Sequence, residues 1–355
     1  MRGFARAIPG RDVVLKKLLL ILLVLAAVAA VVANQLQQRW QQPLAIAPGG
    51  YPLNIGAGET LSSVVAQLQT DGVYSDGWML RLYGRWTGLD QQIKRGEYLV
   101  PAGTSPAMLL TLLQQGRVVS YQVTLPEGIT LSRALQILAA DEVLEHQLSG
   151  PSDPRILALV APHDQTEGLF FPDSYQFERG ASDFDILQRA RSAMSRVLAE
   201  EWQEREEQLP YETPYEALIM ASIVERETGL AEERGEIAGV FVRRLKKNMR
   251  LQTDPTVIYG LGESFDGNLR RKHLQDESNP YNTYRHKGLP PSPIALPGRE
   301  AIHAALHPLP GKSLYFVARG DGGHYFSETL AEHQRAVRKY QLQRREDYRS
   351  SPAPK

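Results

Sequence analysis

The sequence predicts an α+β protein that begins with a transmembrane helix, continues with a small α+β module and ends with a larger mixed α/β domain. Near the N-terminus, an uninterrupted apolar stretch runs from Leu18 to Ala33. Beyond it, short alternating segments and stretches with helical periodicity are interspersed along the chain. The 355 residues include no cysteine, so hydrophobic cores rather than disulfides must hold the domains together. The formal net charge is zero, which argues against a nucleic-acid partner.

The N-terminal apolar stretch predicts a membrane anchor. Its uncharged part can be extended to Gln38, which gives the roughly 20 residues that a spanning helix needs. We therefore expect a basic cytoplasmic N-terminus at 1–17 and a transmembrane anchor at 18–38. A removable signal peptide is the alternative, because Ala27-Val28-Ala29 resembles a cleavage site. In either case the chain from about Gln35 onward lies outside the cytoplasm. The basic residues that precede the stretch are Arg2, Arg6, Arg11, Lys16 and Lys17.

A stalk at 39–50, rich in Gln, Pro and Gly, leads to a module at 51–120. Thr60 is a plausible cap for a first helix, and a second helix is expected around Trp78 to Trp86. Ser105-Pro106 opens a third helix. The segments Ile93–Pro101 and Arg117–Leu125 alternate as strands. Small sheets packed by short helices follow from this pattern.

A second domain is expected at 121–345, followed by a flexible tail at 346–355. Its predicted helices lie at Leu131–Leu148, as one helix or two short ones, at Ile186–Gln208 and at Leu230–Asn248. From Met249 to Pro310 the chain is predicted to be mostly irregular, and such long segments in compact domains are usually functional.

Glu225 follows an unbroken apolar run, Ala217 to Val224. Thr213-Pro214-Tyr215-Glu216 provides a capping signal at the start of this predicted helix, and Gly229 provides a stop. Burial and the negative end of the helix dipole should both raise the pKa of the Glu225 carboxyl, which suits a general acid. An ion pair with Arg226 or Arg243 is the alternative. Glu227 is a rival, but two positions along a helix its side chain diverges from that of Glu225, so the two cannot flank one reacting bond.

Six sequence motifs follow one another along the second domain. They are Glu167–Tyr175, Ala221–Thr228, Met249–Gly260, Tyr281–Tyr284, Gly288–Pro291 and Pro293–Ala295. In this order they resemble the endolytic murein transglycosylases, the MltG or YceG-like family. The resemblance implies a single-pass inner-membrane protein with a cytoplasmic N-terminus and a periplasmic catalytic domain at 121–345. It implies a lyase that cuts the MurNAc-GlcNAc bond within nascent glycan strands, leaves 1,6-anhydro-MurNAc ends and so terminates elongation. The module at 51–120 is similar to the LysM-like peptidoglycan-binding module of that family.

The family's catalytic glutamate matches Glu225, and the resemblance implies no cofactor. One carboxyl suffices for lytic chemistry, because the C6 hydroxyl of the sugar attacks the anomeric carbon and a single residue can act first as acid and then as base. Its expected partners are glycan strands and the inner membrane, and peptidoglycan synthases of the elongation machinery are candidates. Five side chains are of the types that bind acetamido and hydroxyl groups, and a scaffolding role in turns is the alternative for them. They are Gln252, Asp254, Tyr281, Asn282 and Tyr284.

No metal site is expected. His303 and His307 have helical ligand spacing but lack the adjacent glutamate of zinc proteases. Two other functions stay open: a non-catalytic peptidoglycan-binding scaffold of the cell-wall synthesis machinery, and a muramidase-type hydrolase. A hydrolase would need two carboxylates at the bond.

Overall fold

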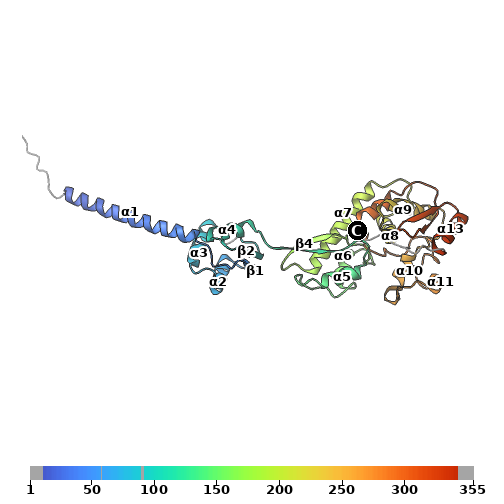
Figure 1. The fold of residues 1–355 in the computed structure, drawn as a ribbon, viewed down its shortest axis with the longest axis horizontal. Coiled ribbons are helices and arrows are strands. Elements are labelled where there is room, and N and C mark those ends of the chain that lie inside the picture. The colour runs from blue at the N-terminus through green and yellow to red at the C-terminus, as the bar shows by residue number, and fades with distance from the viewer. Residues whose placement is uncertain (1–10, 57, 89–91, 343–355) are drawn as a thin grey trace, which may run out of the picture. The chain divides into compact units, whose positions relative to one another are not determined.

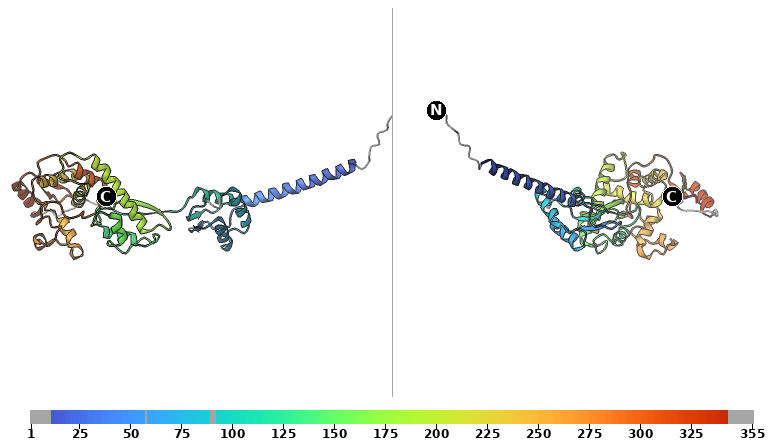
Figure 2. Two further views of the ribbon diagram at one scale, coloured as in Figure 1. Left: turned by 180° about the vertical axis from the view of Figure 1, so that it is seen from behind. Right: turned by 60° about the vertical axis from the view of Figure 1, so that its left-hand side comes forward.

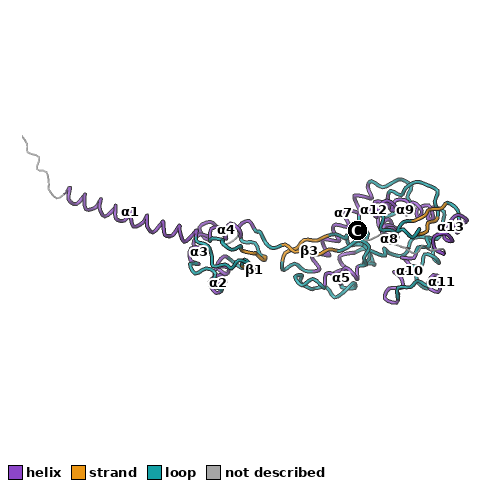
Figure 3. The backbone as a smooth tube through the Cα atoms, in the orientation of Figure 1, coloured by secondary structure: helices purple, strands orange, loops and turns teal. Residues whose placement is uncertain are grey.

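The structure is a computed structural model that describes residues 11–56, 58–88 and 92–342. It divides into two units, Met1–Ser120 and Tyr121–Lys355, and mixes many helices with short strands (Figures 1 and 3). The α+β class predicted from the sequence is confirmed.

Helix α1 (Arg11–Gln41) is a single unbroken helix in every view (Figure 2). Its segment Leu15–Gln41 is long and apolar enough to cross a membrane, and none of its residues is buried. The predicted apolar helix is therefore present, and it continues three residues beyond the expected end at 38.

The rest of the first unit is a small module around one antiparallel strand pair. It contains β1 (Tyr51–Ile55), α2 (Leu61–Thr70), α3 (Gly77–Thr87), β2 (Gly96–Val100) and α4 (Pro106–Gln115). Tyr51 pairs with Val100 and Ile55 with Gly96, so the inward strand residues face the apolar sides of the helices. The predicted cap of α4 is confirmed, because the Ser105 hydroxyl accepts the Met108 N–H at 3.3 Å.

The second unit is built around α8 (Pro214–Glu227), whose residues Ala217 to Val224 are all buried. Helix α12 (Arg299–Leu306) packs closely against α8. Two strand pairs complete the unit, and one of them is the antiparallel pair of β5 (Tyr315–Ala318) with β6 (His324–Ser327). The other elements are β3 (Ser120–Thr124), α5 (Leu131–Ala139), α6 (Pro154–Val160), β4 (Ser174–Glu178), which pairs with β3, α7 (Asp183–Gln203), α9 (Ala231–Lys246), α10 (Asp254–Leu261), η2 (Gly262–Ser264), α11 (Arg271–Gln275), α13 (Leu330–Val337) and η3 (Arg338–Leu342).

The structure corrects three details of the sequence analysis. The helix expected from Leu131 to Leu148 ends at Ala139. The segment from Met249 to Pro310 is mostly irregular, as predicted, but it also contains α10, α11 and the core helix α12, whose short lengths hid their periodicity. Finally, α8 does not end on a left-handed Gly229. Instead Thr228 turns into extended backbone and its hydroxyl accepts the Leu230 N–H at 3.0 Å, which starts the turn into α9.

Candidate active site

Helix α8 carries the two candidate carboxyls, Glu225 and Glu227, on its last turn. Its start is the predicted capping box: the Thr213 hydroxyl accepts the Glu216 N–H at 3.2 Å, and the Glu216 carboxylate accepts the Thr213 N–H at 3.3 Å. Because two residues along a helix subtend roughly 200°, the two side chains point to opposite sides. The predicted divergence is present, and the two carboxyls have different neighbours.

Glu225 is held between two loops and an arginine. One of its oxygens, Oε2, accepts the Gly298 N–H at 3.0 Å, and Oε1 lies 3.9 Å from the Arg234 guanidinium. The same guanidinium lies 3.9 Å from Glu127. Only 7% of the Glu225 side chain is exposed. Burial raises the pKa of the Glu225 carboxyl, the Gly298 N–H opposes that rise, and the Glu127 charge adds to it.

The loop around Gly298 approaches Glu127 closely. A Cβ at this position would lie 1.8 Å from Glu127 Oε1, the end of a flexible and half-exposed side chain, so a larger residue here would displace the Glu127 carboxylate. Hydrogen bonds between the two loops fix this geometry: the Gly128 N–H donates to Leu296 O at 2.8 Å, and the Leu296 N–H donates to Ile129 O at 2.8 Å. Glu225 therefore sits in a tightly packed environment.

Glu227 faces a pocket of about 650 Å³ on the other side of α8. Its carboxyl accepts a hydrogen bond from the Thr253 hydroxyl. Burial raises the pKa of Glu227 to about 7. The Thr253 hydrogen bond and the Arg244 charge oppose this rise, and the Asp254 charge adds to it. A carboxyl in this state is partly protonated near neutral pH and can either donate or accept a proton.

Three of the predicted substrate contacts lie in the Glu227 pocket: Gln252, Asp254 and Tyr284. Gln252 and Asp254 are exposed. The Tyr284 hydroxyl donates to Asp254 Oδ1 at 2.6 Å. The backbone of Gln252 has a φ of +52°, in the left-handed region that a non-glycine residue occupies only at a cost. The structure thus brings these polar groups together with Glu227 and not with Glu225.

The family model for the YceG-like family matches residues 53–339. This chain belongs to the YceG-like family. It is 30% identical over 306 residues to the endolytic murein transglycosylase of Bacillus subtilis (strain 168), covering 81% of this chain and 84% of the relative. It is 26% identical over 320 residues to that of Streptococcus pneumoniae (strain D39), covering 80% of this chain but only 57% of the relative. The crystal structure of a yceG-like protein from Listeria monocytogenes matches with a TM-score of 0.51 and 28% identity, over 81% of this chain and 99% of that one.

Two other predicted contacts of this YceG-like chain are placed differently. Asn282 has no exposed surface, and its amide donates to the carbonyls of His273, Leu274 and Asp276 while its oxygen accepts the Tyr284 N–H. It therefore holds the loop rather than facing a ligand, because buried amides need partners for every polar atom. Tyr281 lies outside the pocket lining, where its hydroxyl pairs with Ser292 at 2.8 Å.

The sequence analysis missed Arg244, which forms one wall of the pocket. Its Nε donates to Leu314 O at 2.6 Å, its NH1 donates to Leu251 O at 2.9 Å, and its guanidinium lies 5.0 Å from the centre of the Tyr315 ring. Arg244 is thus the link between α9, the segment before α10, and β5. Its place on the apolar stripe of α9, four residues after Val240 in the last turn, was the available signal, since an arginine on a buried face requires several acceptors.

A third buried carboxyl, Glu167, has a structural role. It accepts the Leu131 N–H at 2.9 Å, at the first residue of α5, and the Tyr259 hydroxyl at 3.3 Å. Burial raises the pKa of Glu167 to about 7, while these hydrogen bonds oppose the rise. The carboxyl satisfies a free N–H at a helix start, which is a common role for acidic groups.

Within the part of the chain that the structure describes, Glu201, His303 and His307 form a group with metal-ligand character, with ligand atoms within 4.8 Å of one another. His303 Nδ1 lies 2.9 Å from Glu201, and an Arg299 nitrogen lies 2.8 Å from the other oxygen of the same carboxylate. The arginine already supplies the positive charge that a metal ion would bring. We therefore interpret the group as an ion-pair network.

Proposed function

We propose that this protein is an endolytic murein transglycosylase that cuts the MurNAc-GlcNAc bond within nascent glycan strands and leaves 1,6-anhydro-MurNAc ends. The observation that carries the proposal is the Glu227 pocket, which combines a carboxyl of pKa about 7 with polar groups suited to sugars. The names of the two curated relatives support the same activity.

We further propose Glu227 as the proton carrier. It lines a pocket of about 650 Å³ together with the predicted contacts Gln252, Asp254 and Tyr284. Glu225, the candidate from the sequence, also has a raised pKa, but its carboxyl is engaged by Gly298 and lies outside that pocket lining. Glu225 is the alternative proton carrier, and exchange of each residue separates the two proposals.

In the reaction Glu227 first gives a proton to the leaving oxygen and then takes a proton from the attacking hydroxyl. Protonated Glu227 donates to the glycosidic oxygen as the bond from C1 of MurNAc to that oxygen breaks. The C6 oxygen of the same sugar then bonds to C1, and the Glu227 carboxylate takes the C6 hydroxyl proton, which restores the acid. Such acid–base catalysis contributes about 10²- to 10⁴-fold, and alignment of the C6 hydroxyl by the pocket must supply much of the rest. The Thr253 hydroxyl stabilises the carboxylate between the two steps.

The competing hydrolase has one observation in its favour, because Asp254 lines the same pocket and could act as a second carboxylate. Its engagement with the Tyr284 hydroxyl supports a role in binding instead. The decisive experiment is digestion of purified peptidoglycan followed by mass spectrometry of the new glycan ends. Ends one water lighter than reducing ends support the lytic reaction. Reducing ends indicate a muramidase, and binding without new ends indicates a scaffold.

We propose that α1 anchors the protein in the inner membrane, with a cytoplasmic N-terminus and the chain beyond α1 in the periplasm. The length and full exposure of the apolar segment of α1 support retention as an anchor, and cleavage as a signal peptide is the alternative. We also propose that the module at 51–120 is LysM-like and binds glycan. Peptidoglycan synthases are candidate partners. Sequencing the N-terminus of the mature protein tests the anchor, since a start near Asn34 would mean cleavage.

A further inference from the structure

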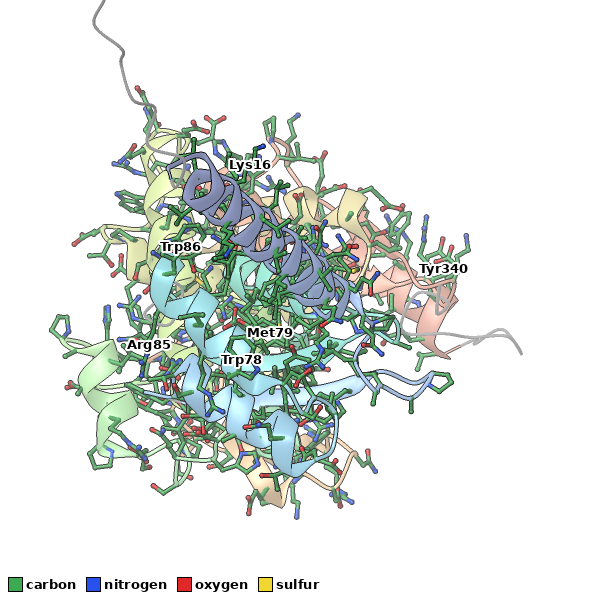
Figure 4. The ribbon with its side chains drawn as sticks, turned by 90° about the vertical axis from the view of Figure 1, so that its left-hand side faces the viewer. Lys16, Trp78, Met79, Arg85, Trp86 and Tyr340 are labelled. Carbon is green, nitrogen blue, oxygen red and sulfur yellow. The ribbon has the colours of Figure 1, made fainter. Side chains whose placement is uncertain are left out.

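The first unit carries an apolar groove that is exposed on its surface. The groove has a volume of about 620 Å³ and is formed by the end of α1 and one face of α3. Three side chains on α3 are largely exposed: Trp86 by 83%, Leu82 by 62% and Trp78 by 50%. We call this surface the aromatic patch; its residues are Leu36, Trp40, Trp78, Met79, Leu82, Tyr83 and Trp86. Figure 4 shows α1 passing α3, on which Trp78, Met79 and Trp86 are labelled.

The packing of α3 fixes which face is exposed. Trp78, Leu82 and Trp86 are four residues apart and so lie on one stripe of the helix. The opposite face is buried through two glycines. A Cβ at Gly77 would lie 2.2 Å from a Val65 methyl, and a Cβ at Gly84 would lie 2.2 Å from a Leu61 methyl. Because α3 cannot rotate without losing these close contacts, the module holds its two tryptophans outward.

The aromatic patch is continuous with the part of α1 that leaves the membrane. The apolar stretch ends at Ala33, and Trp40 follows seven residues later, or roughly 10 Å further along a helix. That distance places Trp40 beyond the hydrocarbon, in the headgroup region, where tryptophan and tyrosine side chains are enriched. Contacts between aromatic rings continue this surface from α1 onto α3. The ring centres of Trp40 and Tyr83 lie 5.0 Å apart, and those of Tyr83 and Trp86 lie 6.2 Å apart.

Polar groups at this level fit a lipid surface. Arg39 of α1 pairs with Asp76 at the start of α3 at 3.4 Å, which holds the two helices together. Arg85 is exposed, lies beside Trp86 in the sequence and is available to lipid phosphates (Figure 4). A basic residue next to exposed tryptophan and leucine is the composition of interfacial membrane-binding helices.

We propose that the aromatic patch lies in the headgroup region of the bilayer leaflet from which α1 emerges, so that the module at 51–120 rests on phospholipid. The proposal rests on the proposed membrane position of α1. A lipid surface is favoured over a second copy of the chain because the patch begins on α1 itself, at the level where the apolar stretch gives way to polar residues. Membrane contact would bury side chains whose exposure to water is otherwise costly.

The test uses the full chain in liposomes of phosphatidylcholine and phosphatidylglycerol, with lipids brominated either near the headgroup or near the acyl terminus. In the W40F/W202F variant, Trp78 and Trp86 are the remaining tryptophans. We expect their fluorescence to be quenched by the shallow bromines and much less by the deep ones. The matched W78F/W86F variant keeps Trp40 and Trp202, and it should lose the share of quenching due to α3.

Carbonate extraction of the same liposomes separates the two proposals. Protein retained by the membrane, but with Trp78 and Trp86 unquenched at either depth, would overturn the inference and leave the anchor standing. Release by carbonate would overturn the anchor and the inference with it. Unquenched tryptophans together with a cross-linked dimer would assign the aromatic patch to contact between two copies. The W78F/W86F variant replaces exposed side chains, and W40F/W202F replaces partly buried ones, all with another aromatic ring; melting temperatures equal to that of the parent should confirm that both variants stay folded.

Discussion

Exchange of Glu227 for glutamine tests the assignment of the proton carrier. Glu227→Gln keeps the size of the side chain and an acceptor for the Thr253 hydroxyl, and it removes the transferable proton. Because the acid and base steps use the same carboxyl, formation of anhydro ends should fall by about 10²- to 10⁴-fold, or about 3 to 5 kcal/mol in barrier height. The assay is the rate at which anhydro ends appear from purified peptidoglycan, measured by mass spectrometry.

Glu225→Gln is the matched control, two residues away on the same helix. Glutamine still offers an oxygen to the Gly298 N–H, and only the attraction to Arg234 at 3.9 Å is lost. The free energy of unfolding should therefore fall by only about 1 kcal/mol, and cleavage should stay near that of the parent. The reasoning is refuted if E225Q abolishes cleavage while E227Q retains it, both melting like the parent. Glu225 would then be the proton carrier.

Four further predictions follow from the same contacts. Cleavage should decline as the pH rises through about 7, where Glu227 loses its proton, and pH–rate profiles measure this. The free energy of unfolding should fall as the pH rises from about 4.5 to about 7, because folded Glu227 and Glu167 keep protons that the unfolded chain has released; urea titrations across this range should show a flatter profile for E167Q. Gly298→Ala should change the free energy of unfolding by no more than about 1 kcal/mol, since the new Cβ meets only the flexible, half-exposed end of Glu127 and the backbone φ of −77° suits alanine; calorimetry that shows a much larger loss would mean that Glu127 cannot move aside. Deletion of 51–120 should weaken binding to intact sacculi and spare turnover of short soluble glycans, and loss of both would mean that the module supports folding.

Local chemistry made α8 predictable. The start and the burial of this helix could be derived from neighbouring residues, because every signal acts within the helix itself. The signals are a threonine cap, a proline at the first position, a glutamate three residues after the cap and a continuous apolar run. The same holds for the start of α4 at Ser105-Pro106 and for α1, whose apolar length needs no tertiary partner. The divergence of Glu225 and Glu227 likewise follows from helix geometry alone.

The surroundings of the two carboxyls could not be derived in this way. Burial of Glu225 followed from its stripe, but burial does not reveal a cavity. The pocket at Glu227 is closed by β5, β6 and α13, which lie far along the chain and reach α8 only through tertiary packing. Asn282 shows the same limit. Its residue type suits a sugar ligand or a turn equally well, and only the three carbonyls around its amide decide the matter.

The left-handed backbone of Gln252 has a consequence for how the wall of the Glu227 pocket is held. The conformation is imposed by Thr283, whose carbonyl accepts the Gln252 N–H at 3.2 Å and whose hydroxyl accepts the Thr253 N–H at 3.1 Å. Glycine would adopt this backbone without strain, but it would lose the amide oxygen that accepts a hydrogen bond from the Arg244 guanidinium at 3.3 Å. The strained backbone therefore carries a side chain that glycine could not supply, and this side chain ties the polar segment at Gln252 to the arginine that lines the same pocket.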